Sequence, residues 1–151
     1  MTLLFPDTLP FTAGKAPYLY KPASSTDRHE RIYVNVAFEG VSTMAVLDTG
    51  APYVICPQEI AQNIGINSST ALEHTRIVFR GNEMDGELHK IRLFIAAEEG
   101  DSAEFDVTAF VPASELGLQP ITPFVGMITC LERIRFALDP QSTTFYFGVA
   151  E

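Results

Sequence analysis

The chain has 151 residues and a formal net charge of −9, from 19 acidic and 10 basic side chains. This length suits one domain, because a compact fold of this size buries roughly 68–70% of the surface that its unfolded chain exposes. An apolar fraction of 46% with 19% charged residues excludes a disordered chain. The acidic balance, without any run of Lys and Arg, argues against nucleic acid or an anionic membrane as a partner.

Cysteine and histidine are too few and too scattered for a disulfide scaffold or a zinc site. Cys56 and Cys130 each lie in an apolar stretch, and His29, His74 and His89 share no metal-ligand spacing. The first residues lack the basic region of a signal peptide, and no apolar run approaches the ~18 residues of a membrane span. We therefore predict a cytoplasmic protein without a metal, a cofactor or a membrane partner.

The first 28 residues differ in composition from the rest. They contain Pro6, Pro10, Pro17 and Pro22 and show no sustained period of 2 or 3.6. We predict an extended arm over residues 1–28, followed by a domain over residues 29–151. The aromatic and leucine side chains of the arm favour packing against the body or against a partner chain, and a disordered leader is the alternative.

Beyond the arm, alternation of apolar and polar residues predicts a succession of hairpins. The predicted strands cover residues 31–38, 41–47, 53–55, 72–79, 87–95, 105–111, 124–125, 136–138 and 143–147. One short helix is predicted to open at Pro57 and stop before Gly65, and a second to cover residues 127–133. The polar segment 80–86 is predicted to join two of the strands as a loop. This pattern indicates a mainly antiparallel β fold.

One short motif stands above this background. Residues 45–51 read Ala-Val-Leu-Asp-Thr-Gly-Ala, which places Asp48 directly after an apolar strand. An isolated carboxylate buried there is unfavourable, so it needs a partner or a raised pKa. Either the segment is only a β-turn, in which the Asp side chain binds the backbone two residues on, or the carboxylate has a chemical role.

The Asp-Thr-Gly-Ala string that starts at Asp48 resembles the active-site loop of aspartic proteases, and most closely that of the single-domain retroviral type, the retropepsins. Residues 124–126, Phe-Val-Gly, with the segment that follows, resemble the apolar-apolar-Gly and helix element that supports this loop. The resemblance covers about residues 31–147. It implies a retropepsin-like closed β-barrel or sandwich with one or two short helices, assembled as a homodimer.

The resemblance also implies an activity, the hydrolysis of peptide bonds by two carboxylates that share one proton and hold a water between them. The chain has a single Asp-Thr-Gly, so the pair requires a C2 homodimer in which Asp48, the catalytic residue, meets its copy on the axis. Thr49 would grip across the two-fold. The backbone around Gly50 and Ala51 would support the carboxylates, and a side chain at Gly50 would hinder this close approach.

Two further elements follow from the same resemblance. The hairpin in the middle of the chain would be the flap that closes over a substrate, and its tip comprises Gly81, Asn82, Glu83, Met84, Asp85 and Gly86. Residues 143–147 are the candidate for the interleaved terminal strand of a dimer interface. An ordinary core hairpin is the alternative for that segment.

Other functions stay open at the level of sequence. The polar flap tip, and Met127, Ile128 and Thr129 where the family often has polar or acidic residues, favour as an alternative an inactive retropepsin-like module that binds peptides or dimerises. A β-barrel binding domain whose Asp-Thr-Gly is only a turn is a third hypothesis. If the chain is a protease, we also expect residues 1–28 to regulate access, by lying in the groove or by bracing the dimer.

Overall fold

The computed structural model describes residues 12–113 and 122–150. Within them the strands are β1 (Gly14–Pro17), β2 (Leu19–Lys21), β3 (Arg31–Phe38), β4 (Val41–Leu47), β5 (Val54–Ile55), β6 (Glu73–Phe79), β7 (Asn82–Ile95), β8 (Glu99–Gly100), β9 (Ala103–Pro112), β10 (Phe124–Val125), β11 (Ile134–Asp139) and β12 (Thr144–Val149). The helical elements are α1 (Gln58–Asn63) and the 3-10 turns η1 (Ser68–Thr70) and η2 (Leu131–Arg133). The expected mainly β fold is confirmed.

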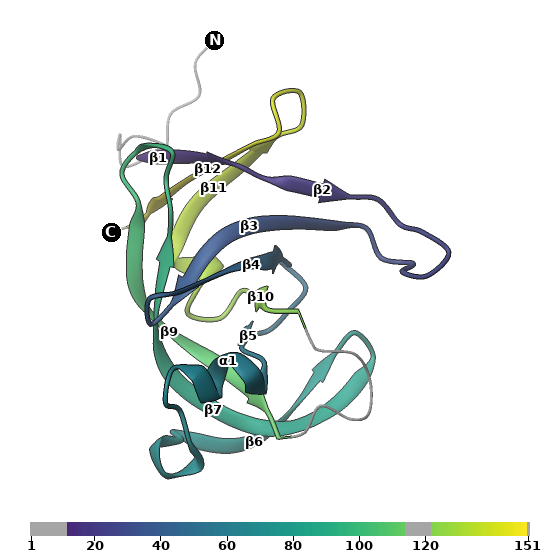
Figure 1. Cartoon of the computed structure of the whole chain (residues 1–151), viewed down its shortest axis with the longest axis vertical. Helices are drawn as coiled ribbons and strands as arrows, with labels where there is room; N and C mark the ends of the chain where they lie inside the picture. Colours follow the sequence, from purple (N-terminus) through teal and green to yellow (C-terminus); the bar gives the residue numbers. More distant parts are fainter. Residues whose placement is uncertain (1–11, 114–121, 151) are drawn as a thin grey trace.

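These strands form two sheets (Figure 1). One has the order β11-β12-β1-β8, and the other has the order β2-β3-β4-β10-β5-β9-β7-β6, with a further pairing between β3 and β7. Most pairings are antiparallel, as the hairpin pattern predicts, but β4 with β10 and β5 with β9 are parallel. Because β5 and β10 have two residues each, no periodicity in the sequence could announce these parallel contacts.

The β3–β4 hairpin leads the chain into the Asp-Thr-Gly segment. Buried Val34 and Val36 alternate with exposed Asn35, as the period of 2 predicts. Glu39 and Gly40 have φ values of 45° and 83°, so they form the two-residue turn whose twist matches that of the strands. The chain therefore returns along β4 in register and reaches its end in the interior.

Helix α1 begins and ends close to the predicted positions. Pro57 is its N-terminal cap, and Gly65 follows it with a φ of 78°. The Gly65 N–H donates to Gln62 O (3.1 Å) and the Ile66 N–H donates to Ala61 O (2.9 Å), the paired bonds of a Schellman motif. The glycine is required here because it takes the left-handed conformation at low cost.

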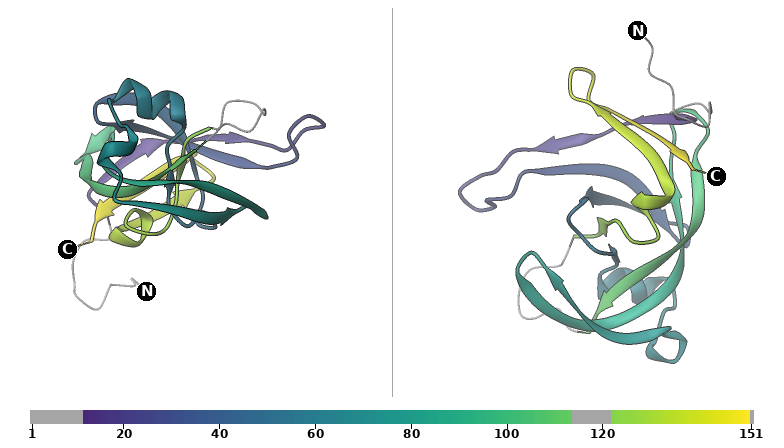
Figure 2. Two further views of the ribbon diagram at one scale, coloured as in Figure 1. Left: turned by 90° about the horizontal axis from the view of Figure 1, so that it is seen from below. Right: turned by 180° about the vertical axis from the view of Figure 1, so that it is seen from behind.

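Part of the segment 1–28 belongs to the sheets. β1 pairs with β12 on one side and with β8 on the other. β2 pairs with β3, and the two form a long hairpin that projects from the rest of the fold, seen from two directions in Figures 1 and 2. Residues 1–11 lie outside the described residues. The division of the chain into an arm and a domain at residue 28 stays a prediction.

None of the described helices has the length and apolarity to cross a membrane.

The buried apolar side chains form two clusters. The larger one is built around Phe38, Leu93, Phe145 and Phe147. The smaller one, here called the loop-flap cluster, comprises Val46, Ala51, Ile55, Ile77, Phe79, Leu88, Phe110 and Phe124, with Tyr33, Tyr53 and Met84 packed against it. Since its members come from β4, the Asp-Thr-Gly-Ala string, β10 and the β6–β7 hairpin, this cluster ties the motif to the hairpin.

Candidate active site

The Asp-Thr-Gly loop begins where β4 ends, and backbone hydrogen bonds fix its position. In the parallel pairing of β4 with β10, Leu47 lies opposite Val125. One residue further, the Asp48 N–H donates to Val125 O (3.1 Å), and the Asp48 carbonyl accepts from the Ala51 N–H (3.2 Å). The pairing with β10 therefore fixes the position of the Asp48 backbone, from which its side chain extends.

The Asp48 carboxylate has a different partner on each oxygen. The Gly50 N–H donates to Oδ1 at 2.9 Å, which is the bond expected of an Asp-Thr-Gly turn. Arg80 Nη2 donates to Oδ2 at 3.2 Å. Only 19% of the Asp48 side chain is exposed, so the guanidinium compensates a partly buried charge. The turn thus uses Oδ1, while Oδ2 is directed to the hairpin.

Arg80 is the residue that sequence reasoning missed. It occupies the connection between β6 and β7, where its φ is 52° and that of Gly81 is 79°. Its guanidinium carbon lies 5.5 Å from the centroid of the Phe79 ring and 4.9 Å from that of the Phe124 ring. The signal that could have found it is an arginine directly before glycine in a hairpin turn, a position that usually holds Asn, Asp or Gly.

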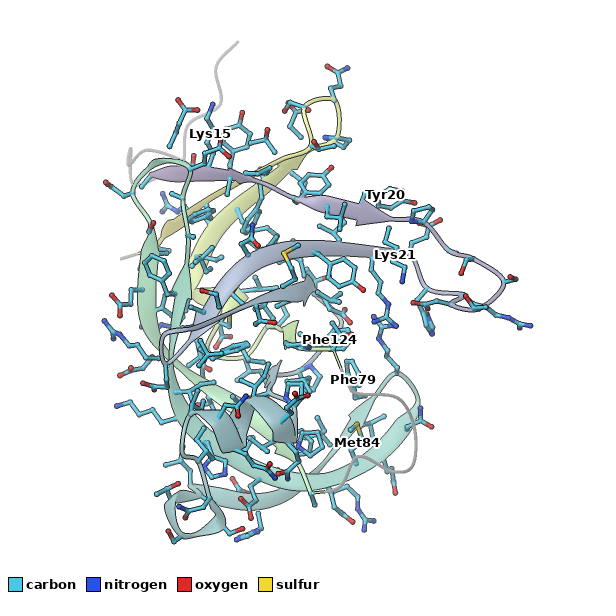
Figure 3. All side chains as sticks on the ribbon, in the orientation of Figure 1. Lys15, Tyr20, Lys21, Phe79, Met84 and Phe124 are labelled. Carbon is cyan, nitrogen blue, oxygen red and sulfur yellow. The ribbon has the colours of Figure 1, made fainter. Side chains whose placement is uncertain are left out.

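The two rings under Arg80 also join the hairpin to β10. Phe79 and Phe124 meet edge to face with centroids 4.8 Å apart. Figure 3 shows them side by side, with Met84 below them on the hairpin. Aromatic pairs of this kind contribute about 0.5–1.5 kcal/mol beyond the burial of their surface. The hairpin tip is therefore held against the Asp48 loop by an ion pair and by an aromatic contact.

The other residues of the predicted loop divide into exposed and buried members. Thr49 and Gly50 are exposed. Ala51 is 1% exposed, and its carbonyl accepts from the Met127 N–H at 2.9 Å. A Cβ at Gly50 would lie 3.2 Å from Asp48 Oδ1, which is tight but meets no backbone atom. Within one chain, Gly50 is therefore less constrained than its place in the motif suggests.

The glycine with no room for a side chain is Gly126. A Cβ at this position would clash with the Tyr53 carbonyl and would lie 2.6 Å from Ala51 O. Both obstacles are backbone atoms, which cannot rotate away as a flexible side chain would. The Phe-Val-Gly segment therefore needs its glycine because the Asp-Thr-Gly-Ala string packs directly against it.

The structure divides the predicted flap tip differently from the sequence. The connection between β6 and β7 consists of Arg80 and Gly81, while Asn82 already pairs with Phe79 across the hairpin. The predicted loop over 80–86 is thus wrong, because its last five residues extend β7. Two of the six predicted flap residues point inward: Met84 packs on the loop-flap cluster, and Gly86 is buried.

Charged side chains cover the outer face of the same hairpin. Arg76 Nε lies 2.8 Å from Asp85 Oδ1, and Arg76 Nη1 lies 3.5 Å from Glu83 Oε2. The ion pair lowers the pKa of the Asp85 carboxyl and raises that of the Arg76 guanidinium. These three residues are well exposed, so their pairing stabilises the hairpin only slightly.

The predicted helix over residues 127–133 is wrong. Only Leu131–Arg133 is helical, as the 3-10 turn η2. Thr129 has a φ of 63°, which a right-handed helix excludes. Two bonds of 2.7 Å hold it there, because its Oγ1 accepts from the Thr108 N–H and its own N–H donates to Glu132 Oε1.

The terminal segment proposed for an interleaved interface is already paired within the chain. β12 lies between β11 and β1, and it pairs with β11 over residues 144–149 and with β1 over residues 144–147. Phe145 and Phe147 are buried in the larger cluster. Of the two alternatives for residues 143–147, the core hairpin is what the described chain contains, with residues 144–147 paired on both sides.

Both cysteines are free and buried. Burial raises the pKa of the Cys56 thiol and that of the Cys130 thiol to about 12, because the thiolate loses its hydration. In the described residues, no group of three or more His, Cys, Asp or Glu side chains is close enough together to hold a metal ion. Partly buried acid–arginine pairs occur at Asp48–Arg80 and at Asp27–Arg31, and the first of them lies at the Asp-Thr-Gly loop.

Comparisons with known proteins bear on the fold. No model of a known protein family matches the chain, and the search of curated proteins found no match to it. Among solved structures, the fold is similar to that of a retropepsin-like aspartic protease from Rickettsia conorii, with a TM-score of 0.55 and 17% sequence identity. The match covers 87% of this chain and 98% of that one. The expected retropepsin-like fold is supported, and at this identity the likeness establishes the fold alone.

Proposed function

We propose that the chain is an aspartic endopeptidase that acts as a homodimer, with Asp48 of each subunit as the catalytic residue. One observation carries the proposal. In a fold similar to that of a retropepsin-like aspartic protease, Asp48 leaves the end of β4 in a turn fixed by β10, with its carboxylate partly buried under the β6–β7 hairpin. The hairpin serves as the flap, and the retropepsin-like closed barrel is the architecture that we infer for the whole.

The chemistry requires two carboxylates. Two such groups about 3 Å apart cannot both ionise, so they share one proton and hold a water between them. One carboxylate removes a proton from the water as it attacks the peptide carbonyl carbon, and the other donates its proton to the carbonyl oxygen. The carboxyl that took the proton from the water then gives it to the leaving nitrogen as the C–N bond breaks, and the other carboxylate takes a proton back from a hydroxyl of the gem-diol intermediate, which restores the single shared proton. In each subunit the Gly50 N–H would keep Oδ1 oriented throughout, leaving Oδ2 for the water.

The second carboxylate would come from a second copy. A C2 axis beside the loop brings the same residue of both subunits together. Thr49 is exposed next to Asp48, which leaves its hydroxyl available for the grip across the axis. The substrate would be a peptide or protein, and the two free thiols favour the reducing cytoplasm as the compartment.

Subunit mixing tests the carboxylate and the dimer together. Asp48→Asn should lower kcat/KM by about a thousandfold or more on a cleavable peptide, because proton transfer is lost. Asp48→Asn protein in excess should also inhibit a fixed amount of wild-type protein, since mixed dimers hold one carboxylate. Asp106→Asn is the matched control, because Asp106 is a half-exposed residue of β9 paired with Lys90 and Arg92. An Asp48→Asn variant with wild-type activity would end the proposal.

The second candidate is an inactive module of the same fold that binds peptides or dimerises. It is favoured by the ion pair itself, because Arg80 occupies the Oδ2 oxygen that a catalytic carboxylate needs. In that case dimers and peptide complexes would form, and the peptides would stay intact. Wild-type protein and Asp48→Asn protein would then not differ in peptide cleavage. Mass spectrometry of peptides after prolonged incubation with wild-type protein separates the two functions.

A further inference from the structure

The part of the β6–β7 hairpin in which the two strands pair, residues 73–88, carries two arginines in different surroundings. Arg76 is 60% exposed and is paired with acidic residues of its own hairpin. Arg80 is 26% exposed and is paired with Asp48, which lies 32 residues earlier in the chain. Arg80 is therefore the hairpin arginine whose charge faces the candidate active site.

The position of the Arg80 guanidinium is constrained from several directions. Its backbone forms a two-residue turn, and its head group lies over the rings of Phe79 and Phe124. A cation over an aromatic ring is attracted by the negative face of the ring. Moving the guanidinium into open water would lose both ring contacts, so we expect it to stay over the site when its carboxylate partner changes.

The charge balance of the proposed dimer leaves one guanidinium without a partner. Two Asp48 carboxylates and two Arg80 guanidiniums sum to zero when both acids are ionised. The catalytic state has one proton shared between the carboxylates, so one positive charge remains over the cleft. A partly desolvated cation without a counter-ion is unfavourable. The site in its working protonation state therefore favours a ligand that brings a negative charge.

We propose that Arg80 is a specificity-determining residue that binds a carboxylate of the peptide substrate close to the scissile bond. The proposal rests on the protease function proposed above. The planar guanidinium suits a carboxylate because two of its N–H groups can donate in parallel to the two oxygens. The carboxylate is that of an Asp or Glu side chain or of a peptide C-terminus, and the substrate class is an acidic peptide.

The net negative charge of the chain opposes the binding of acidic peptides at long range only. Each chain carries −9, which repels an acidic peptide in dilute buffer. At about 0.15 M salt, interactions beyond roughly 8 Å are largely screened, whereas a contact inside a partly buried site is screened much less. The selectivity should therefore be measured at physiological salt or above.

The first experiment uses paired peptides, acetylated and amidated at their ends, with Glu or Gln scanned through each position around a cleavable bond. Wild-type protein should cleave the Glu peptide about tenfold or more faster in kcat/KM at one or two positions, as expected for a charge-assisted hydrogen bond. Arg80→Gln should abolish this ratio, and Arg80→Lys should keep part of it. Arg76→Gln, the matched control on the same hairpin, should leave it unchanged.

A third peptide, with Gln at that position and a free C-terminus, identifies the source of the carboxylate. Acceleration by the side chain or by the free terminus supports the proposal and tells which one Arg80 binds. If Arg80→Gln accelerates Glu and Gln peptides equally, Arg80 only blocks Asp48, and the proposal is overturned. Equal cleavage of both peptides by wild-type protein overturns it as well, while leaving the protease function intact.

A binding experiment separates this proposal from the protease function. In Asp48→Asn protein, Arg80 loses its carboxylate partner, so a fluorescent Glu peptide should bind at least about tenfold more tightly than its Gln twin by anisotropy. The double variant Asp48→Asn, Arg80→Gln should lose this difference, with circular dichroism as the check on folding. If the Asp48→Asn protein bound the Glu peptide selectively but wild-type protein cleaved neither peptide, the protease function would be refuted. The binding of a peptide carboxylate by Arg80 would then still be supported. A failure to bind either peptide would refute both.

Discussion

Thr129 shows how one residue can override a local helical pattern. Its left-handed backbone conformation prevents the helix that the apolar spacing of residues 127–133 predicts. The Thr108 N–H donates to the Thr129 hydroxyl at 2.7 Å. The hydroxyl thus joins the segment after Gly126 to β9. Without that acceptor, a partly buried backbone N–H would lose its partner.

We therefore expect Thr129→Ala to lower the free energy of unfolding by about 1–3 kcal/mol. Thr129→Ser is the matched control, because serine keeps the hydroxyl and should retain most of the stability. Urea unfolding of the three proteins measures the difference. If alanine and serine gave the same stability, the hydrogen bond to Thr108 would carry no weight.

The buried thiols predict how stability depends on pH. Cys56 and Cys130 have pKa values raised to about 12 by burial, whereas an exposed thiol titrates near 9. The folded chain therefore binds more protons than the unfolded chain between pH 9 and 12, so the free energy of unfolding falls as the pH rises through that window. The slope is about 1.4 kcal/mol for each pH unit and each thiol.

Alanine variants isolate this contribution from other groups that titrate at high pH. The double variant Cys56→Ala, Cys130→Ala should show a shallower fall in unfolding free energy from pH 9 to 11, although its stability at pH 7 is lower. Equal slopes for the variant and the wild-type protein would mean that the thiols are not buried in the folded chain.

At the scale of elements, the joint between β10 and the Asp-Thr-Gly-Ala string has the least tolerance for added volume. Gly126→Ala would press a methyl group on the carbonyl groups of Ala51 and Tyr53. We expect a loss of about 3 kcal/mol, since overpacking against backbone cannot relax through a rotamer. Gly40→Ala, in a turn with open space, is the control and should cost about 1 kcal/mol through its positive φ alone. Equal losses in a denaturant titration would contradict this assignment.

The tip of the β6–β7 hairpin is the part of this element that the sequence pattern does not reveal. Its existence follows from the flanking alternation, but its tip was predicted too long. Met84 and Gly86 do alternate with exposed Glu83 and Asp85 in β7. One inward position is a glycine, which has no side chain, and the outward ones are charged, so the period of 2 is hidden. Only the pairing of Asn82 with Phe79 shows that the strand begins there.

At the scale of the whole molecule, the predicted arm over residues 1–28 is the segment expected to regulate access to the active site. Deleting residues 1–28 would remove β1, which pairs with β12 and β8, and would damage the sheet. Deleting residues 1–11 leaves every described strand in place and is the better experiment. If the arm regulates access, this truncation should change the rate of peptide cleavage or the dimer dissociation constant by several-fold, without a change in melting temperature. Unchanged values of both would end that hypothesis.

The sequence by itself determined the β strands around Asp48, the turn at Asp-Thr-Gly and the limits of α1. These features follow from alternation, glycine and proline over a few neighbouring residues. The single Asp-Thr-Gly also led to the proposal of a dimer, because the resemblance to aspartic proteases implies two carboxylates and the chain has one such motif. Tertiary structure decided which group faces Asp48: Arg80 reaches it because the hairpin curls back over β10, and the rings of Phe79 and Phe124 hold it there. An ion pair across 32 residues depends on how the sheet folds over itself, and no local pattern encodes that path.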